Sequence, residues 1–130
     1  MKTRLIALIA VIGVSAFALG GCSTQARAER KGKEAGDQIC KAKDANNAND
    51  AGRHIKRAQD KLDDLSRFTG RNVRQESNTL DRNLDQIARG NATEQDINAV
   101  ISSIQDARKG TSGNAQAAYD GVLEALANCD

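Results

Sequence analysis

The sequence has no proline and no tryptophan, and it has only two phenylalanines and one tyrosine. Runs of β-branched residues of the kind that form strands are missing as well. A chain without proline and with many alanines favours helices over sheets. Its core has to be assembled from Leu, Ile, Val and Ala, so we expect helices that pack closely together.

Side chains that carry chemistry are also scarce. His54 is the only histidine, and together with Cys40 and Cys129 it does not make a four-ligand zinc set. The glycines are isolated, so no phosphate-binding loop is expected. No nucleophile-elbow sequence surrounds the serines of the polar helical segments, Ser66, Ser77, Ser102 and Ser103. We therefore expect no catalytic residues, no metal and no cofactor.

Without the first 21 residues, the chain has no excess of positive or negative charge. The whole chain has 19 Lys and Arg residues against 17 Asp and Glu residues. Lys2 and Arg4 lie in the first 21 residues, which hold no acidic residue, so the remainder has 17 of each sign. A balanced charge offers no argument for binding nucleic acid.

The start of the chain has the pattern of an export signal. Lys2 and Arg4 precede an apolar run over residues 5–19, which is shorter than the roughly 20 residues of a membrane-spanning helix. The run ends in Leu19-Gly20-Gly21-Cys22. Residues 1–22 together resemble the signal peptide and lipobox of a bacterial prolipoprotein.

This resemblance implies a processing site and a location. The signal peptide of residues 1–21 is removed between Gly21 and Cys22, and the Cys22 thiol carries a diacylglycerol, with acyl chains such as palmitate. The protein is then held on the non-cytoplasmic side of a membrane of the cell envelope. Ser23, where Asp would retain it, resembles an outer-membrane sorting signal if the cell is Gram-negative. The alternatives are a secretory signal with a chance cysteine and a retained membrane anchor.

Residues 22–36 are predicted to form a lipidated N-terminus and a flexible tether, because they show no apolar periodicity. Their basic residues are solvated or attract anionic lipid weakly. Residues 37–130 form the folded domain. Apolar residues spaced three and four apart predict an all-α, up-down bundle of about four helices. We expect helical segments near residues 34–45, 50–68, 72–90, 93–109 and 113–129, the first two being one bundle helix with a break. Thr93 is the expected N-cap of the fourth segment, and Ser112 is a candidate N-cap of the fifth.

Cys40 and Cys129 remain as an even pair in an oxidising compartment, so a disulfide is expected, the alternative being two reduced thiols. The bridge constrains the first helix. An unbroken helix over residues 40–68 would be about 42 Å long and would carry Cys40 away from Cys129. Because Asn and Asp favour turns and caps, we expect the helix to break within residues 44–50, where these residues are concentrated.

These features predict a non-catalytic interaction or accessory module that contacts another envelope protein through a helical face. The alternatives are a binding module for a lipid or a small hydrophobic ligand, and a phage- or plasmid-type surface-exclusion lipoprotein. Several arginines are expected on exposed faces, where their charge either recruits a partner or only keeps the protein soluble. They are Arg57, Arg67, Arg71, Arg74 and Arg82.

Overall fold

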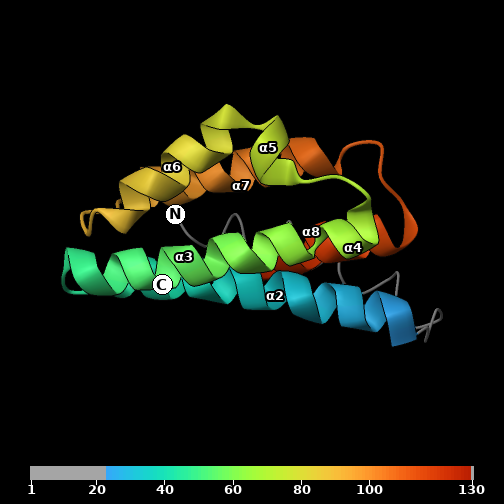
Figure 1. Cartoon of the computed structure of the whole chain (residues 1–130), viewed down its shortest axis with the longest axis horizontal. Coiled ribbons are helices and arrows are strands. Elements are labelled where there is room, and N and C mark those ends of the chain that lie inside the picture. Colours follow the sequence, from blue (N-terminus) through green and yellow to red (C-terminus); the bar gives the residue numbers. More distant parts are fainter. Residues whose placement is uncertain (1–22, 130) are drawn as a thin grey trace.

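The computed structural model describes residues 23–129, and within this range every regular element is a helix. The five longer helices are α2 (Ser23–Asp44), α3 (Ala48–Asp64), α6 (Asn78–Ala88), α7 (Glu94–Arg108) and α8 (Gly113–Ala127). Two single-turn helices, α4 (Ser66–Thr69) and α5 (Val73–Glu76), lie between α3 and α6 (Figure 1). The prediction of a small all-α bundle is confirmed.

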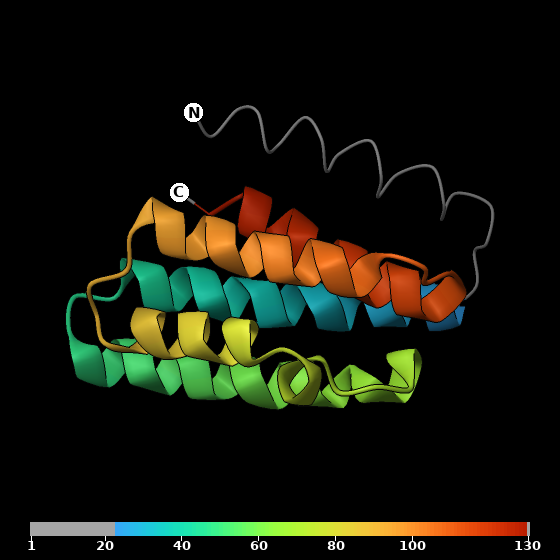
Figure 2. The ribbon, with the colours of Figure 1, turned by 90° about the horizontal axis from the view of Figure 1, so that it is seen from above.

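Successive long helices run antiparallel, so the chain goes up and down along one axis (Figures 1 and 2). Each long helix contacts its neighbours in sequence, and α8 also packs extensively on α2. Because an odd number of long helices is used, α8 runs in the same direction as α2. Gly32 therefore faces Ala118 and Val122, while Cys40, farther along α2, lies beside Cys129.

The expected flexible tether is wrong for the residues that the structure describes, because residues 23–36 form the first part of α2. Ala28, Ala35, Ile39 and Ala42 are 0–1 % exposed. With Gly32 they repeat at spacings of four and three, which is the pattern of a helix face packed in a bundle. The expected helix start near residue 34 is wrong for the same reason, since small residues carry the pattern.

The break between the first two long helices lies where the sequence predicts it. Helix α2 ends at Asp44 and α3 begins at Ala48. Asn47 caps α3, because its side-chain oxygen accepts a hydrogen bond of 2.8 Å from the backbone N–H of Asp50. The Asn- and Asp-rich stretch thus ends one helix and starts the next.

The expected helix over residues 72–90 is interrupted. Asn72 caps the single turn α5, and Ser77 then adopts an extended conformation with φ −130°. The Ser77 hydroxyl accepts a hydrogen bond from the N–H of Leu80 and so caps α6. A side chain that competes for backbone hydrogen bonds explains the interruption.

The last two helices lie close to their predicted limits. Thr93 and Asp96 form a reciprocal capping box at the start of α7, as the N-cap prediction requires. Ser112 is the N-cap residue of α8, as predicted, but its side chain makes no capping hydrogen bond. Among residues 23–129, no helix combines the length and apolar character needed to cross a membrane.

Candidate functional site

The predicted cleavage and lipidation site, Gly21 and Cys22, lies outside the described residues. Ser23, which follows Cys22, is the first residue of α2. The predicted anchor therefore adjoins a helix of the folded bundle.

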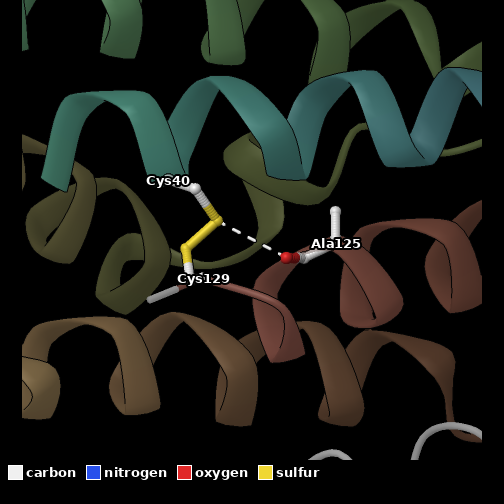
Figure 3. The surroundings of a disulfide bond; sticks show 3 residues. All are labelled: Cys40, Ala125 and Cys129. Atoms are coloured by element: carbon white, nitrogen blue, oxygen red, sulfur yellow. Dashed lines mark hydrogen bonds between the residues drawn. A yellow bond between two sulfur atoms is a disulfide. The ribbon is translucent and has the colours of Figure 1, made fainter. Parts of the chain in front are cut away.

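Cys40 and Cys129 lie at disulfide-bonding distance, with their Cα atoms 5.3 Å apart (Figure 3). This separation is ordinary for a disulfide. The Cys40 Sγ is also 3.4 Å from the carbonyl oxygen of Ala125. Since a disulfide sulfur carries no proton, this is an S···O contact in the oxidised protein. The structure thus brings together the two cysteines that the sequence analysis paired.

Glycines set the close approach of α2 and α8. A methyl group on Gly32 would overlap the carbonyl oxygen of Ala118, and one on Gly121 would overlap that of Glu29. Gly36 lies in the same way against Val122 and Ala125. The two backbones therefore pack at a distance that only glycine permits.

Polar side chains join α2 to α3 on its other side. Lys61 Nζ lies 3.2 Å from a carboxylate oxygen of Glu34, and His54 Nδ1 lies 2.8 Å from the amide oxygen of Gln38. Desolvation, followed by the nearby cations Arg53 and others, lowers the pKa of His54. The only histidine of the chain therefore serves in a contact between two helices.

A carboxylate is buried at the contact of α7 and α8. Asp120 is 3 % exposed and accepts a hydrogen bond of 2.5 Å from Nε of Arg108. Burial raises the pKa of the Asp120 carboxyl, while the Arg108 hydrogen bond acts in the opposite direction. The sequence analysis did not single out this pair. The signal that could have found it is an acidic residue, Asp120, inside the apolar pattern of residues 117–127.

Among the arginines expected on exposed faces, Arg74 is engaged within the bundle. Arg74 binds the carboxylates of both Asp63 and Asp81 at 2.9 Å, and its side chain is 24 % exposed. It joins α5 to α3 and α6 and is not a freely available charge. Arg71, on the preceding turn, is exposed and pairs with Glu76 at 2.7 Å.

A hollow of about 600 Å³ lies between α7 and the segment that holds α5 and the start of α6. We call it the polar groove. It is lined on one side by Arg71, Val73, Glu76, Ser77 and Thr79, and on the other by Ala99, Ser102, Ser103, Asp106 and Ala107. A second hollow of about 260 Å³ shares Arg71, Glu76 and Asp106 with it and reaches Tyr119. Burial raises the pKa of Tyr119, opposed by its hydrogen bond to Thr69.

The polar groove offers hydroxyl groups and paired charges, which can exchange hydrogen bonds with a polar partner. Ser102 and Ser103 lie in it, whereas His54 is held by Gln38 at the α2–α3 contact. Within residues 23–129, no three His, Cys, Asp or Glu side chains are grouped so as to hold a metal ion.

The chain was compared with protein-family models, with curated proteins and with solved structures. None of these matches it.

Proposed function

We propose that this protein is a lipoprotein of the bacterial cell envelope, whose helical bundle is a non-catalytic module for contact with another envelope protein. The observation that carries this proposal is the sequence Leu19-Gly20-Gly21-Cys22, which ends directly before the first residue of α2. Acyl chains on Cys22 would hold the bundle at the membrane surface without a long spacer.

The cysteine pattern supports the same compartment. Cys22 is taken by the lipid, and the other two cysteines lie at disulfide-bonding distance. Disulfides persist in exported proteins and are rare in the bacterial cytoplasm. Ser23 after the lipidated cysteine favours the outer membrane in a Gram-negative cell.

Intact mass spectrometry of the protein purified from bacterial membranes tests the anchor. We expect the mass of a chain that starts at Cys22 and carries acyl chains, lower by two hydrogens than after reduction. A Cys22→Ser variant should keep its leader and carry no acyl mass. An unacylated wild-type chain would contradict the anchor, and two thiols that alkylate without reduction would contradict the bridge.

We propose the polar groove as the contact surface for the partner, because its lining of hydroxyls and charged groups suits a protein surface better than an apolar ligand. A photo-crosslinking residue at Ser103 should give an adduct of one discrete mass in native membranes. The matched control is Arg57, an exposed residue of α3 outside the groove. Equal labelling from both positions would contradict a partner at the groove, and a co-purifying lipid or metabolite would favour ligand binding.

A further inference from the structure

The two ends of the bundle differ in charge. One end is formed by the start of α2, by α4 with its flanking turns, and by the α7–α8 turn (Figures 1 and 2). We call it the anchor end, because α2 begins there. Across residues 23–31, 64–71 and 106–112 it has seven basic residues and three acidic ones. The basic residues are Arg27, Arg30, Lys31, Arg67, Arg71, Arg108 and Lys109. Arg71 and Arg108 pair with Glu76 and Asp120, which lie outside these ranges, so with these two acids the excess is two positive charges.

The opposite end holds no such excess. It is formed by the α2–α3 turn, the α6–α7 turn and the residues around Cys129, as the closeness of Gly90 to Ala48 and of Cys40 to Cys129 indicates. Across residues 41–50, 88–96 and 127–129, three basic residues stand against four acidic ones. The near-neutral chain is thus polarised along its long axis, with the positive end next to Cys22.

A small hollow at the anchor end concentrates this charge. It has a volume of about 160 Å³ and is lined by Arg27, Lys31, Asp64, Arg67 and Phe68. Arg27 and Arg67 are exposed and form no ion pair with another residue of the described chain, 23–129. Lys31 has only a long contact of 3.9 Å with Glu34. Phe68, half-buried, puts an aromatic ring among these three cations.

We propose that the anchor end docks on the anionic phospholipid headgroups of the membrane that holds Cys22, with Arg27, Lys31 and Arg67 binding phosphate and Phe68 at the level of the headgroups. This inference rests on the anchor proposed above. Cations bind the phosphate of headgroups, and Phe is one of the apolar residues that segments lying in the membrane interface combine with Lys and Arg.

The distances from the anchor support a lipid surface over a soluble partner. Adjacent Cα atoms are about 3.8 Å apart, so an acylated Cys22 holds Ser23 at the surface. Along α2, a rise of about 1.5 Å per residue puts Arg27 about 6 Å and Lys31 about 12 Å from Ser23. These separations are comparable to the Debye length of about 8 Å at physiological salt. The anchor thus confines the positive end to the region where anionic lipid attracts it.

Tryptophan fluorescence of the lipidated protein in vesicles tests the docking. The chain has no tryptophan, so a Phe68→Trp variant has a single reporter at the hollow. In vesicles of phosphatidylglycerol and phosphatidylcholine with brominated acyl chains we expect strong quenching, lost at high salt. In vesicles of pure brominated phosphatidylcholine we expect little quenching. An Asn49→Trp variant, exposed at the opposite end, should not be quenched in either.

Charge variants give the second readout. In the Phe68→Trp background, Arg27→Gln with Lys31→Gln and Arg67→Gln should lower the docked-to-undocked ratio on the order of fivefold for each charge removed. The matched control neutralises three cations at the opposite end, Lys41→Gln, Lys43→Gln and Arg89→Gln, and should leave quenching unchanged. Circular dichroism confirms that each variant is folded.

Several outcomes would overturn the docking. These are equal quenching in both vesicle types, quenching unchanged in the anchor-end triple variant, and a protein adduct in place of a lipid adduct from a photo-crosslinker at Arg67. The mass of the same preparation reports acylation of Cys22 separately. An acylated chain without charge-dependent quenching would reject the docking alone, whereas an unacylated chain would reject the anchor.

Discussion

Gly32 has no room for a side chain, whereas Gly52 has. Added to Gly32, a methyl group would overlap the Ala118 carbonyl oxygen, while at Gly52, inside α3, it would meet only the Ala88 oxygen at 3.9 Å. Backbone atoms cannot move aside as a flexible side chain does, so the α2–α8 contact would have to open. The same substitution therefore has opposite effects at the two positions.

We predict that Gly32→Ala lowers the free energy of unfolding by about 1–3 kcal/mol, the cost of overpacking. Gly52→Ala should raise it by up to about 1 kcal/mol, because alanine is the better helix former and nothing crowds it. Urea denaturation of both variants measures the difference. A Gly32→Ala protein as stable as the parent would contradict the close packing of α2 on α8.

The two N-caps of the last helices make a second matched pair. Thr93 accepts a hydrogen bond from the Asp96 backbone and is part of a capping box, whereas Ser112 makes no capping hydrogen bond. Thr93→Ala should cost about 1 kcal/mol of stability, and Ser112→Ala should cost almost none. Thermal unfolding followed by circular dichroism measures both, and equal losses would show that Ser112 caps α8 in solution.

Asp120 makes stability depend on pH. Its pKa is raised above the ordinary value of 3.8, chiefly by burial, so the folded protein holds this proton more tightly than the unfolded chain. The stability from this carboxyl is therefore fully present below pH 3.8 and is lost as pH rises through the raised folded pKa.

The Asp120→Asn substitution removes the titrating carboxyl and leaves a side chain of nearly the same size and shape. From pH 3.5 to pH 7 we expect the wild type to lose stability relative to Asp120→Asn, as measured by denaturation at each pH. A relative gain with rising pH would mean that the ion pair with Arg108 dominates, and that the pKa of Asp120 is lowered.

At the scale of the element, the sequence predicts helices whose faces are built from large apolar residues. Helix α3, with Ile55 and Leu62, and helix α7, with Ile97 and Ile104, lie close to their predicted positions. The start of α2 could not be found in that way, because its buried face consists of alanine and glycine. Such residues contribute little apolar area. Their role is the close packing of α2 on α8, which depends on the small residues of both helices.

The candidate sites follow the same division. Pairing Cys40 with Cys129 needed only a cysteine count and the oxidising compartment that residues 1–22 imply. The polar groove could not be predicted, since only the tertiary fold brings Arg71, which precedes α5, and Ser103 of α7 to the same hollow. The burial of Asp120 likewise depends on which face of α8 meets Arg108.

Hydrogen exchange tests whether α2 is a helix over its whole described length. We expect the amides of residues 28–39 to be protected as strongly as those of the middle of α8, because the two helices pack together and are linked at one end. Mass spectrometry of peptic fragments gives the comparison. Exchange of residues 28–36 at the rate of an unfolded chain would restore the flexible tether.

At the scale of the whole molecule, the bridge between Cys40 and Cys129 closes a loop with a sequence separation of 89 residues. In the chain-entropy model such a closure stabilises the fold by about 4–5 kcal/mol. A Cys40→Ser, Cys129→Ser double variant should lose about that amount, measured by denaturation under oxidising conditions. Reduction of the parent should reproduce the loss, and an unchanged midpoint in both would mean that the thiols are not joined.

The position of the bridge at the far end of α2 also limits how far the protein can be pulled apart. Suppose that a bound partner pulls the bundle away from the membrane. The force then acts on the first turn of α2, and it can separate α2 from α8 only as far as Cys40. The freed residues, 23–39, would extend to about 60 Å. Beyond that point the force passes through the disulfide to Cys129, just after the end of α8. The extension of the N-terminal segment under force would therefore have a fixed upper limit.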